Sequence, residues 1–245
     1  MGTITWGRDI AEVYDATYAT QFDPAALEPV LDLLVELAGA GAALELAVGT
    51  GRVALPLSGR GVRVSGIELS PPMVEQLQAK PGADAISVTI GDMATTRVPG
   101  PFSLVYVVVN TIMNVTTQDE QVAVFENAAA HLEPGGCFVV EVLVPDLRAF
   151  APGHPPTRAF TMDADHLAIE TLDDPVGQIA SSHHWIAAEG RLVHHTAPYR
   201  YVWPAELDLM ARVAGLRLRD RWQDWHRTPF TATSTTQVAV YEQPT

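Results

Sequence analysis

Short apolar runs alternate with amphipathic segments between residues 41 and 145. The runs are rich in valine and isoleucine, are too short for helices, and lie at about 42–48, 62–67, 86–90, 103–109 and 137–144. Runs of this kind are typical of strands buried on both faces of a parallel sheet. The pattern therefore predicts a sheet with helices between its strands.

The segments between the runs carry clear signals for helix ends. Ser70-Pro71 places an N-cap residue before a proline that fits the first turn of a helix. Thr117 and Glu120 form a capping box, and the helix that they open is predicted to stop at Pro134-Gly135-Gly136. Alternating strands and helices predict an α/β fold of the doubly wound type.

The flanking regions complete a single predicted domain, residues 1–245. A helix at 24–38 belongs to a helical cap, 1–40, and 146–157 is a proline-rich linker. Period-two alternation over 158–203, with turns at 173–175 and 189–190, predicts antiparallel strands. A helix at 204–214 and strands at 216–222 and 236–242 raise the main sheet to seven strands. The core is thus 41–145 plus 204–245, with an antiparallel β insertion, 146–203, as a lid.

Composition and net charge exclude several classes of binding partner. Lys and Arg total 15 against 29 Asp and Glu, so the net charge is −14. Such a surface repels nucleic acid and anionic lipid, and no apolar run is long enough to span a membrane. The chain has one cysteine, Cys137, and its first residues do not resemble a secretory signal. We expect a cytoplasmic protein without a metal site, as a monomer or a homodimer.

Glycines and a carboxylate gather where the first predicted strand ends. Gly49 and Gly51 allow a tight turn and a close approach of the backbone to a ligand. Glu45 is a carboxylate within an apolar strand, which is unfavourable unless it binds a cation or accepts hydrogen bonds. Because ligands of open parallel sheets lie beyond the carboxyl ends of the strands, we expect a site here.

The following strands end in residues suited to a nucleoside. Glu68 stands 23 positions after Glu45, where a carboxylate can accept two hydrogen bonds from a ribose diol. Asp92 follows the third strand and can accept from an exocyclic amine, while Met93 can pack against a flat ring. The fourth strand ends in Val109-Asn110.

Four stretches together resemble the class I S-adenosylmethionine-dependent methyltransferases: LELAVGTGR, GIELS, GDM and Leu132–Gly136. The resemblance covers about residues 40–145 and implies a Rossmann-like fold with S-adenosylmethionine as cofactor. It implies that Glu45 and the Gly49–Gly51 turn contact the methionyl half, that Glu68 holds the ribose, and that Leu69, Asp92 and Met93 surround the adenine. The full set of implied cofactor-binding residues is Tyr14, Tyr18, Glu45, Ala47, Gly49, Thr50, Gly51, Arg52, Glu68, Leu69, Met73, Asp92, Met93, Val109 and Asn110.

Two details qualify the resemblance. Tyr-Asp-x-x-Tyr at Tyr14–Tyr18, with the antiparallel insertion, is similar to the subgroup that methylates small molecules such as amino sugars. Ala47 stands where the family usually has its first glycine.

A competing interpretation is an NAD-dependent oxidoreductase, since Gly49–Ala54 fits a dinucleotide fingerprint. Glu45 argues against it, because its charge would lie close to a pyrophosphate, whereas a sulfonium cofactor brings its own ammonium group.

Two histidine pairs lie on the insertion. With a two-residue turn at 189–190, His184 faces His195 and Trp185 faces His194. His184 and His195 then share an inward face with Ile186, which makes them the candidate catalytic residues. A general base, a metal site and simple packing stay open, although two imidazoles without a nearby carboxylate make a poor metal site.

The substrate side is less specific. Its candidate binding residues are Met113, Glu141, Tyr199, Tyr201, Trp203 and His226, although aromatic residues at spacing two are more often core. The predicted activity is transfer of a methyl group from S-adenosylmethionine to an oxygen or nitrogen of a small molecule, by in-line displacement. A non-catalytic S-adenosylmethionine-binding protein is the alternative from another class.

Overall fold

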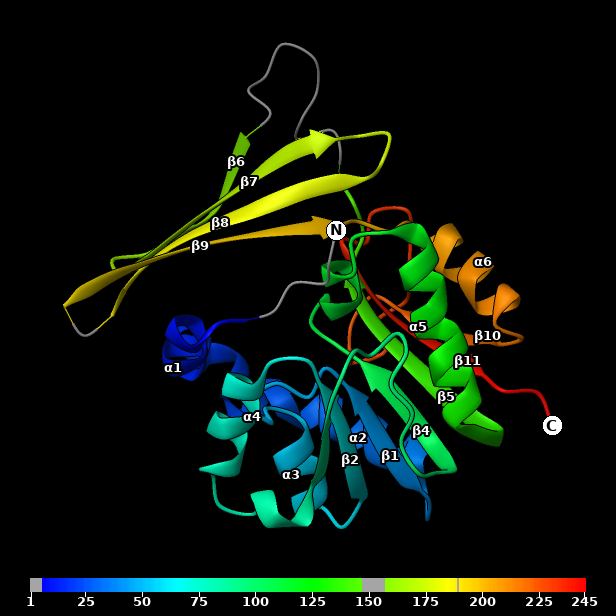
Figure 1. The fold of residues 1–245 in the computed structure, drawn as a ribbon. Helices are drawn as coiled ribbons and strands as arrows, with labels where there is room; N and C mark the ends of the chain where they lie inside the picture. The colour runs from blue at the N-terminus through cyan, green and yellow to red at the C-terminus, as the bar shows by residue number, and fades with distance from the viewer. Residues whose placement is uncertain (1–5, 147–156, 189) are drawn as a thin grey trace.

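The computed structural model describes residues 6–146, 157–188 and 190–245. The described residues form two separate sheets (Figure 1). The larger has seven strands in the order β10-β11-β5-β4-β1-β2-β3, in which β11 runs in the opposite direction to the other six. The predicted mainly parallel seven-stranded sheet is therefore confirmed. Its strands are β1 (Ala42–Leu46), β2 (Arg63–Glu68), β3 (Ser87–Ile90), β4 (Phe102–Val107), β5 (Leu132–Leu143), β10 (Arg217–Trp222) and β11 (Thr236–Glu242).

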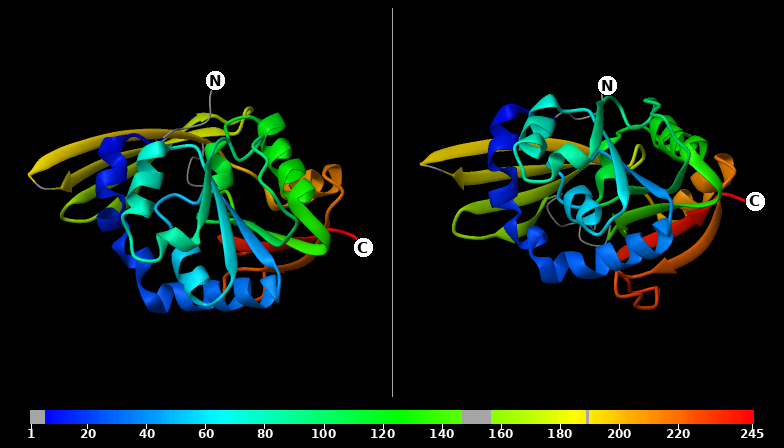
Figure 2. Two further views of the ribbon diagram at one scale, coloured as in Figure 1. Left: turned by 60° about the horizontal axis from the view of Figure 1, so that its bottom comes forward. Right: turned by 90° about the horizontal axis from the view of Figure 1, so that it is seen from below.

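Helices cover both faces of this sheet (Figure 2). The helices are α1 (Arg8–Thr17), α2 (Pro24–Ala38), α3 (Ala54–Gly59), α4 (Pro71–Gln78), α5 (Gln118–His131) and α6 (Pro204–Val213), with the short 3₁₀ helices η1 (Ala19–Phe22), η2 (Ala83–Ala85) and η3 (Thr111–Asn114). In β4, Leu104 and Tyr106 pack with α2 and α3, while Val105 and Val107 pack with α5 and α6. Both faces are apolar because both are buried, as the sequence pattern predicts.

The predicted helix caps form, but several element ends differ from the prediction. The Ser70 hydroxyl accepts from the Met73 amide at 3.4 Å, and the Thr117 hydroxyl accepts from the Glu120 amide at 3.2 Å. Helix α5 ends at His131, three residues before the predicted stop, because β5 begins at Leu132. Strand β4 ends at Val107 rather than 109, because residues 109 and 110 adopt left-handed conformations that a strand cannot contain.

Chain connections diverge at the centre of the sheet. From β1 the chain proceeds to β2 and β3 on one side, and from β4 to β5 on the other. The carboxyl ends of β1 and β4 therefore border the crevice in which ligands of such sheets bind.

The second sheet is antiparallel and lies over this crevice, with β8 and β9 reaching beyond the seven-stranded sheet (Figure 1). Its strands are β6 (Thr157–Met162), β7 (His166–Asp174), β8 (Ile179–Ala188) and β9 (Arg191–Arg200). The predicted register is confirmed, since His184 pairs with His195 and Trp185 with His194. Of the predicted proline-rich linker, residues 147–156 lie outside the described residues, as does Glu189 in the predicted turn.

A buried cation joins the second sheet to the helices beneath it. Arg200, at the end of β9, donates to Gln121 on α5 at 2.5 Å and to Gln178 at 2.8 Å. It also donates to Glu206 on α6 at 2.6 Å. Such charge-assisted bonds hold the sheet in place above the strand ends. Among the described residues, no helix is both long and apolar enough to cross a membrane.

Candidate active site

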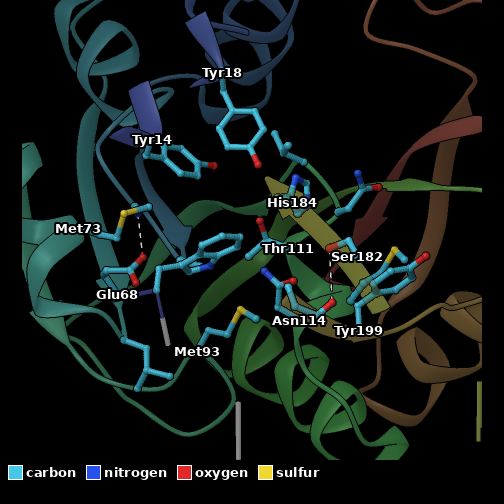
Figure 3. Close-up of a pocket in the computed structure, with 18 of the residues that line it drawn as sticks. Tyr14, Tyr18, Glu68, Met73, Met93, Thr111, Asn114, Ser182, His184 and Tyr199 are labelled. Carbon is cyan, nitrogen blue, oxygen red and sulfur yellow. Dashed lines mark hydrogen bonds between the residues drawn. The ribbon is translucent and has the colours of Figure 1, made fainter. Parts of the chain in front are cut away.

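A cavity of about 520 Å³ opens between the strand ends of the main sheet, helix α1 and the second sheet (Figure 3). Most of the residues predicted to bind a cofactor line it, together with three of the predicted catalytic and substrate-binding residues. These predicted residues are Tyr14, Tyr18, Ala47, Gly49, Glu68, Leu69, Met73, Asp92, Met93, Val109, Asn110, Met113, His184 and Tyr199. The fold thus brings three distant parts of the sequence to one cavity.

Glu68 is the carboxylate at the end of β2. One of its oxygens accepts from the Gly49 amide at 2.8 Å, and the other accepts from the Ser70 amide at 2.8 Å. Burial raises the pKa of Glu68, and these backbone donors oppose that rise. Each carboxylate oxygen can accept a second hydrogen bond. Glu68 therefore connects two turns and still presents acceptor positions to the cavity (Figure 3).

The glycine turn after β1 has three residues in left-handed conformations. Ala47 has φ 59°, Gly49 φ 57° and Gly51 φ 81°. Only Ala47 and Gly49 line the cavity. A side chain at Gly51 would come within 3.0 Å of Leu55 and Leu77, so this glycine is required by packing against α3 and α4.

Glu45 lies behind the cavity and does not line it. It is only 4% exposed and accepts from the Tyr106 hydroxyl at 3.0 Å. Burial raises the pKa of Glu45 to about 8, opposed by the Tyr106 hydrogen bond and the nearby Arg52 charge. A carboxyl group with this pKa is mainly protonated at neutral pH and is stabilised in its ionised form by any cation that approaches.

Thr50 and Arg52 support the glycine turn from outside the cavity. The Thr50 hydroxyl donates to Asp15 on α1 at 2.6 Å, and Lys80 both pairs with Asp15 and donates to the Thr50 carbonyl at 2.7 Å. Arg52 donates to the Gln21 carbonyl at 3.4 Å. These contacts attach α1 and its tyrosines to the turn, a function of Asp15 that the Tyr-Asp-x-x-Tyr pattern does not reveal.

The two tyrosines of that pattern form one wall of the cavity. Their ring centroids lie 4.8 Å apart, and Tyr14 also meets the edge of Trp6 at 6.0 Å. Burial raises the pKa of Tyr18 to about 12. The phenols are therefore neutral at physiological pH, and both hydroxyls point into the cavity (Figure 3).

On the opposite side, the turn after β3 presents Asp92 and Met93. Asp92 accepts from the Ala94 amide at 2.8 Å, which fixes its carboxylate at the strand end. Met93 is buried, and with Leu69 and Met73 it gives this part of the cavity a largely apolar wall. A flat aromatic ring with an amino substituent matches such a wall and carboxylate.

A strained turn follows β4. Val109 and Asn110 have φ 56° and 60°. This conformation is uncommon for Val109, whose side chain is β-branched, and costs about 1–3 kcal/mol there. Glu141 stabilises this turn, because one of its oxygens accepts from the Val109 amide at 2.8 Å and the other from the Trp225 indole at 2.7 Å. Glu141 therefore holds the cavity wall and lies outside the lining, contrary to its predicted substrate contact.

The far end of the cavity carries an ion pair that the sequence analysis did not identify. Arg158 on β6 pairs with Glu170 on β7 at 2.8 Å, and the Tyr199 hydroxyl on β9 also donates to Glu170. Ser182, directly opposite Glu170 in the β7–β8 register, lines the same end. Ser182 could have been predicted from the sequence, because it stands two residues before His184 on one strand and so shares its face.

His184 projects into the cavity between these two ends (Figure 3). It is 7% exposed, and its Nδ1 lies 2.9 Å from Nε2 of His166 on β7. Burial, followed by the charges of His166, His195 and His183, lowers the pKa of His184 to about 4, so its imidazole is neutral at pH 7. His195 does not line the cavity and packs against Trp6 with ring centroids 4.7 Å apart.

Three predicted substrate-binding residues lie away from the cavity. Tyr201 is buried in the core, and its hydroxyl donates to the Pro175 carbonyl at 3.3 Å. Trp203 is the exposed N-cap residue of α6, and His226 is exposed in the turn between β10 and β11. Alternation along a strand placed Tyr201 and Trp203 on one face with Tyr199, but the chain leaves the second sheet at Arg200. His226 was predicted on the last strand pair, but β10 ends at Trp222.

Comparisons with known proteins agree with this arrangement. A methyltransferase domain family matches residues 43–136. The structure of the CcbJ methyltransferase from Streptomyces caelestis covers 100% of both chains with 35% identity and a TM-score of 0.86. The cypemycin N-terminal methyltransferase of a Streptomyces species is 26% identical over 201 residues, 82% of each chain. An N,N-dimethyltransferase for dTDP-4-amino-2,3,4,6-tetradeoxy-D-glucose, from Saccharopolyspora spinosa, is 31% identical over 136 residues, 54% of each chain.

The fold is a Rossmann-like α/β fold, with a cavity at its topological switch point. The chain belongs to the S-adenosylmethionine-dependent methyltransferases, and S-adenosylmethionine is its cofactor. This assignment decides between the two cofactors that the glycine turn allowed, and the oxidoreductase alternative is wrong.

Proposed function

We propose that this chain transfers the methyl group of S-adenosylmethionine to an amine nitrogen of a small molecule. The observation that carries the proposal is one continuous cavity with Glu68 at one end and a neutral imidazole, His184, facing the other. The two curated relatives, which are named an N-terminal methyltransferase and an N,N-dimethyltransferase, favour an amine over a hydroxyl group as acceptor.

The residues of the first end fit the cofactor. Glu68 would accept from the ribose hydroxyls, Asp92 from the adenine amino group, and Leu69, Met73 and Met93 would enclose the ring. Gly49 would leave room for the methionyl portion, and the positive charge of its ammonium group would favour the ionised form of Glu45, which lies behind the turn. When bound, the cofactor supplies a methyl group activated by a sulfonium.

The residues of the second end would position the acceptor. Glu170 would attract the cationic amine, with Tyr199 and Ser182 as further polar contacts. His184 would accept the proton that the amine must lose to become nucleophilic. The aromatic wall of Trp6, Tyr14 and Tyr18 would exclude water, and alignment of the two reacting groups supplies much of the acceleration.

A paired acceptor screen tests the proposal. The protein is incubated with S-adenosylmethionine and with aminodeoxy sugar nucleotides or short peptides, each beside its N-acetylated counterpart, and products are identified by mass spectrometry. We expect methylation of a free amine and none of the acetylated partner. Transfer only to hydroxyl groups would contradict the amine assignment, and cofactor binding without transfer to any acceptor would favour the non-catalytic alternative.

We also propose that residues 1–245 act as one unit in which the second sheet is the lid over the acceptor. The net charge of −14 supports a small-molecule acceptor over nucleic acid, because a phosphate backbone would be repelled. A cytoplasmic location accords with this metabolic function. Analytical ultracentrifugation distinguishes a monomer from a homodimer.

A further inference from the structure

A second histidine lies directly behind the proposed base. Nε2 of His166 is 2.9 Å from Nδ1 of His184, and the two rings are stacked at 26° with centroids 5.2 Å apart. The bond occupies Nδ1 of His184, so Nε2 is the nitrogen that remains for a ligand in the cavity. His166 is only partly buried, whereas His184 is buried, so the pair leads from the cavity towards solvent.

The surroundings of the pair favour a neutral base. Besides His166, two histidines oppose protonation of His184 by their charge: His195 on β9, and His183, which precedes His184 on β8. Tyr18 meets His166 edge-on at 6.3 Å, and Phe160 on β6 meets His184 edge-on at 5.7 Å. Glu170 and Arg158, which pair with each other, are the charged groups at the acceptor end of the same cavity.

We propose that His166 is a positioning residue for methyl transfer, which directs Nε2 of His184 towards the acceptor amine and then takes over the proton. This inference rests on the proposed function and adds the path by which the proton leaves. In the resting pair, the proton on Nδ1 of His184 is donated to the unprotonated Nε2 of His166.

The step balances in atoms and charge. The protonated amine first gives its proton to Nε2 of His184, while the Nδ1 proton of His184 moves to Nε2 of His166 and the Nδ1 proton of His166 leaves to water. The amine lone pair then forms the C–N bond as the C–S bond breaks, with that electron pair remaining on sulfur. After this relay both imidazoles are neutral, and the positive charge of the sulfonium ends on the methylated nitrogen.

Two other interpretations of the pair are weaker. Across the described ranges, no group of three or more His, Cys, Asp or Glu side chains is arranged to hold a metal. Packing alone does not require a nitrogen-to-nitrogen hydrogen bond at the edge of a cavity, and His195, which packs on Trp6, shows what a packing histidine looks like here. The hydrogen bond and the exposure of His166 both favour proton transfer.

The test uses His166→Gln and His166→Phe, with His194→Ala as a matched control. Gln keeps a hydrogen-bonding partner for His184 but cannot pass a proton on, whereas Phe removes both functions. His194 is exposed on the outer face, where it stacks on Trp185 at 4.9 Å. We expect His166→Gln and His166→Phe to lose about tenfold to a thousandfold in kcat with unchanged cofactor affinity, and the control to match wild type. In a third variant, His166→Ala, we expect added imidazole to restore kcat.

A wild-type kcat in His166→Gln would overturn the relay. If the wild-type protein methylates no amine, the proposed function fails. The histidine pair can still be tested by side-chain nitrogen NMR of the complex with S-adenosylhomocysteine, which reports which ring nitrogens carry a proton. The proposal requires a proton on Nδ1 of His184 and none on its Nε2 above pH 7, with loss of that pattern in His166→Phe. The opposite tautomer in the wild-type protein would overturn it.

Discussion

The end of the cavity that we propose for the cofactor is held together largely by backbone amide groups, whereas the end that we propose for the acceptor is held together by side chains. At the first end, Glu68, Asp92 and Glu141 each accept from amide groups of the turns that follow β1, β2, β3 and β4. At the second end, Arg158 and Glu170 contact one another across separate strands of the antiparallel sheet. The geometry of the first end therefore depends on the backbone turns of the fold, whereas the geometry of the second end depends on particular side chains.

This difference has a consequence for specificity. Turns that hold a common cofactor must keep their backbone geometry, so their glycines and carboxylates cannot change freely. Side chains on the inner face of an antiparallel sheet can change without altering the register, because alternate residues still point to the same face. We therefore expect acceptor selectivity to depend on the second sheet, with cofactor affinity left intact by changes there.

The largest effect is expected at the acceptor end. His184→Asn should lower kcat by about 10²- to 10⁴-fold, because it removes the proton acceptor. Cofactor affinity, measured by calorimetric titration, should not change, since His184 comes from the second sheet and lies apart from Glu68 in the cavity (Figure 3). Normal turnover would return His184 to a packing role.

The next effect is expected at the cofactor end. Glu68→Ala should weaken S-adenosylmethionine binding by about 2–4 kcal/mol, or roughly 30- to 1000-fold in Kd, through the lost ribose contacts. Glu170→Gln is the matched control, because it removes a carboxylate from the other end and should change only the KM of the acceptor. Equal cofactor Kd values for Glu68→Ala and wild type would remove Glu68 from the site.

Stability should depend on pH through His184. Its pKa is about 4 in the folded chain against 6.5 when unfolded, so below pH 6.5 the unfolded chain binds more protons. Above pH 6.5 the neutral His184 does not lower the free energy of unfolding. As the pH falls from 6.5 to 4, protonation of the unfolded chain lowers that free energy by up to about 3 kcal/mol. Urea unfolding at pH 7 and pH 4.5 should therefore show a smaller loss in His184→Asn than in wild type. Equal losses would contradict the burial of a neutral imidazole.

The smallest effect concerns the strained turn at the cofactor end. Ala47 has a left-handed backbone that costs an L-residue about 1–2 kcal/mol, while glycine loses about 0.5–1 kcal/mol more conformational entropy on folding. Ala47→Gly should raise the free energy of unfolding by up to about 1 kcal/mol without changing cofactor affinity. A less stable variant would show that contacts of the alanine methyl group outweigh the strain.

The sequence predicted the main sheet, the caps at Ser70 and Thr117, and the β8–β9 register. Each of these depends on neighbouring residues, through apolar periodicity, side-chain capping or hairpin geometry. It also indicated Glu68, Asp92 and Gly49, which line the cavity, because residues of one turn appear as contiguous motifs. Tyr201 and Trp203 lie away from the cavity because alternation was carried past the end of β9, and His226 lies beyond the end of β10.

By itself the sequence therefore determined the fold class, the cofactor and the residues at the ends of the parallel strands. Only the tertiary structure decided that Glu45 lies behind the cavity and that Glu141 supports the Val109 turn. It also decided that Arg158 and Glu170 line the cavity and that His166 contacts His184. Periodicity gives the face on which a side chain lies, but not the partner across it. That partner depends on how the second sheet lies over the first, which Arg200 and the packing around it establish.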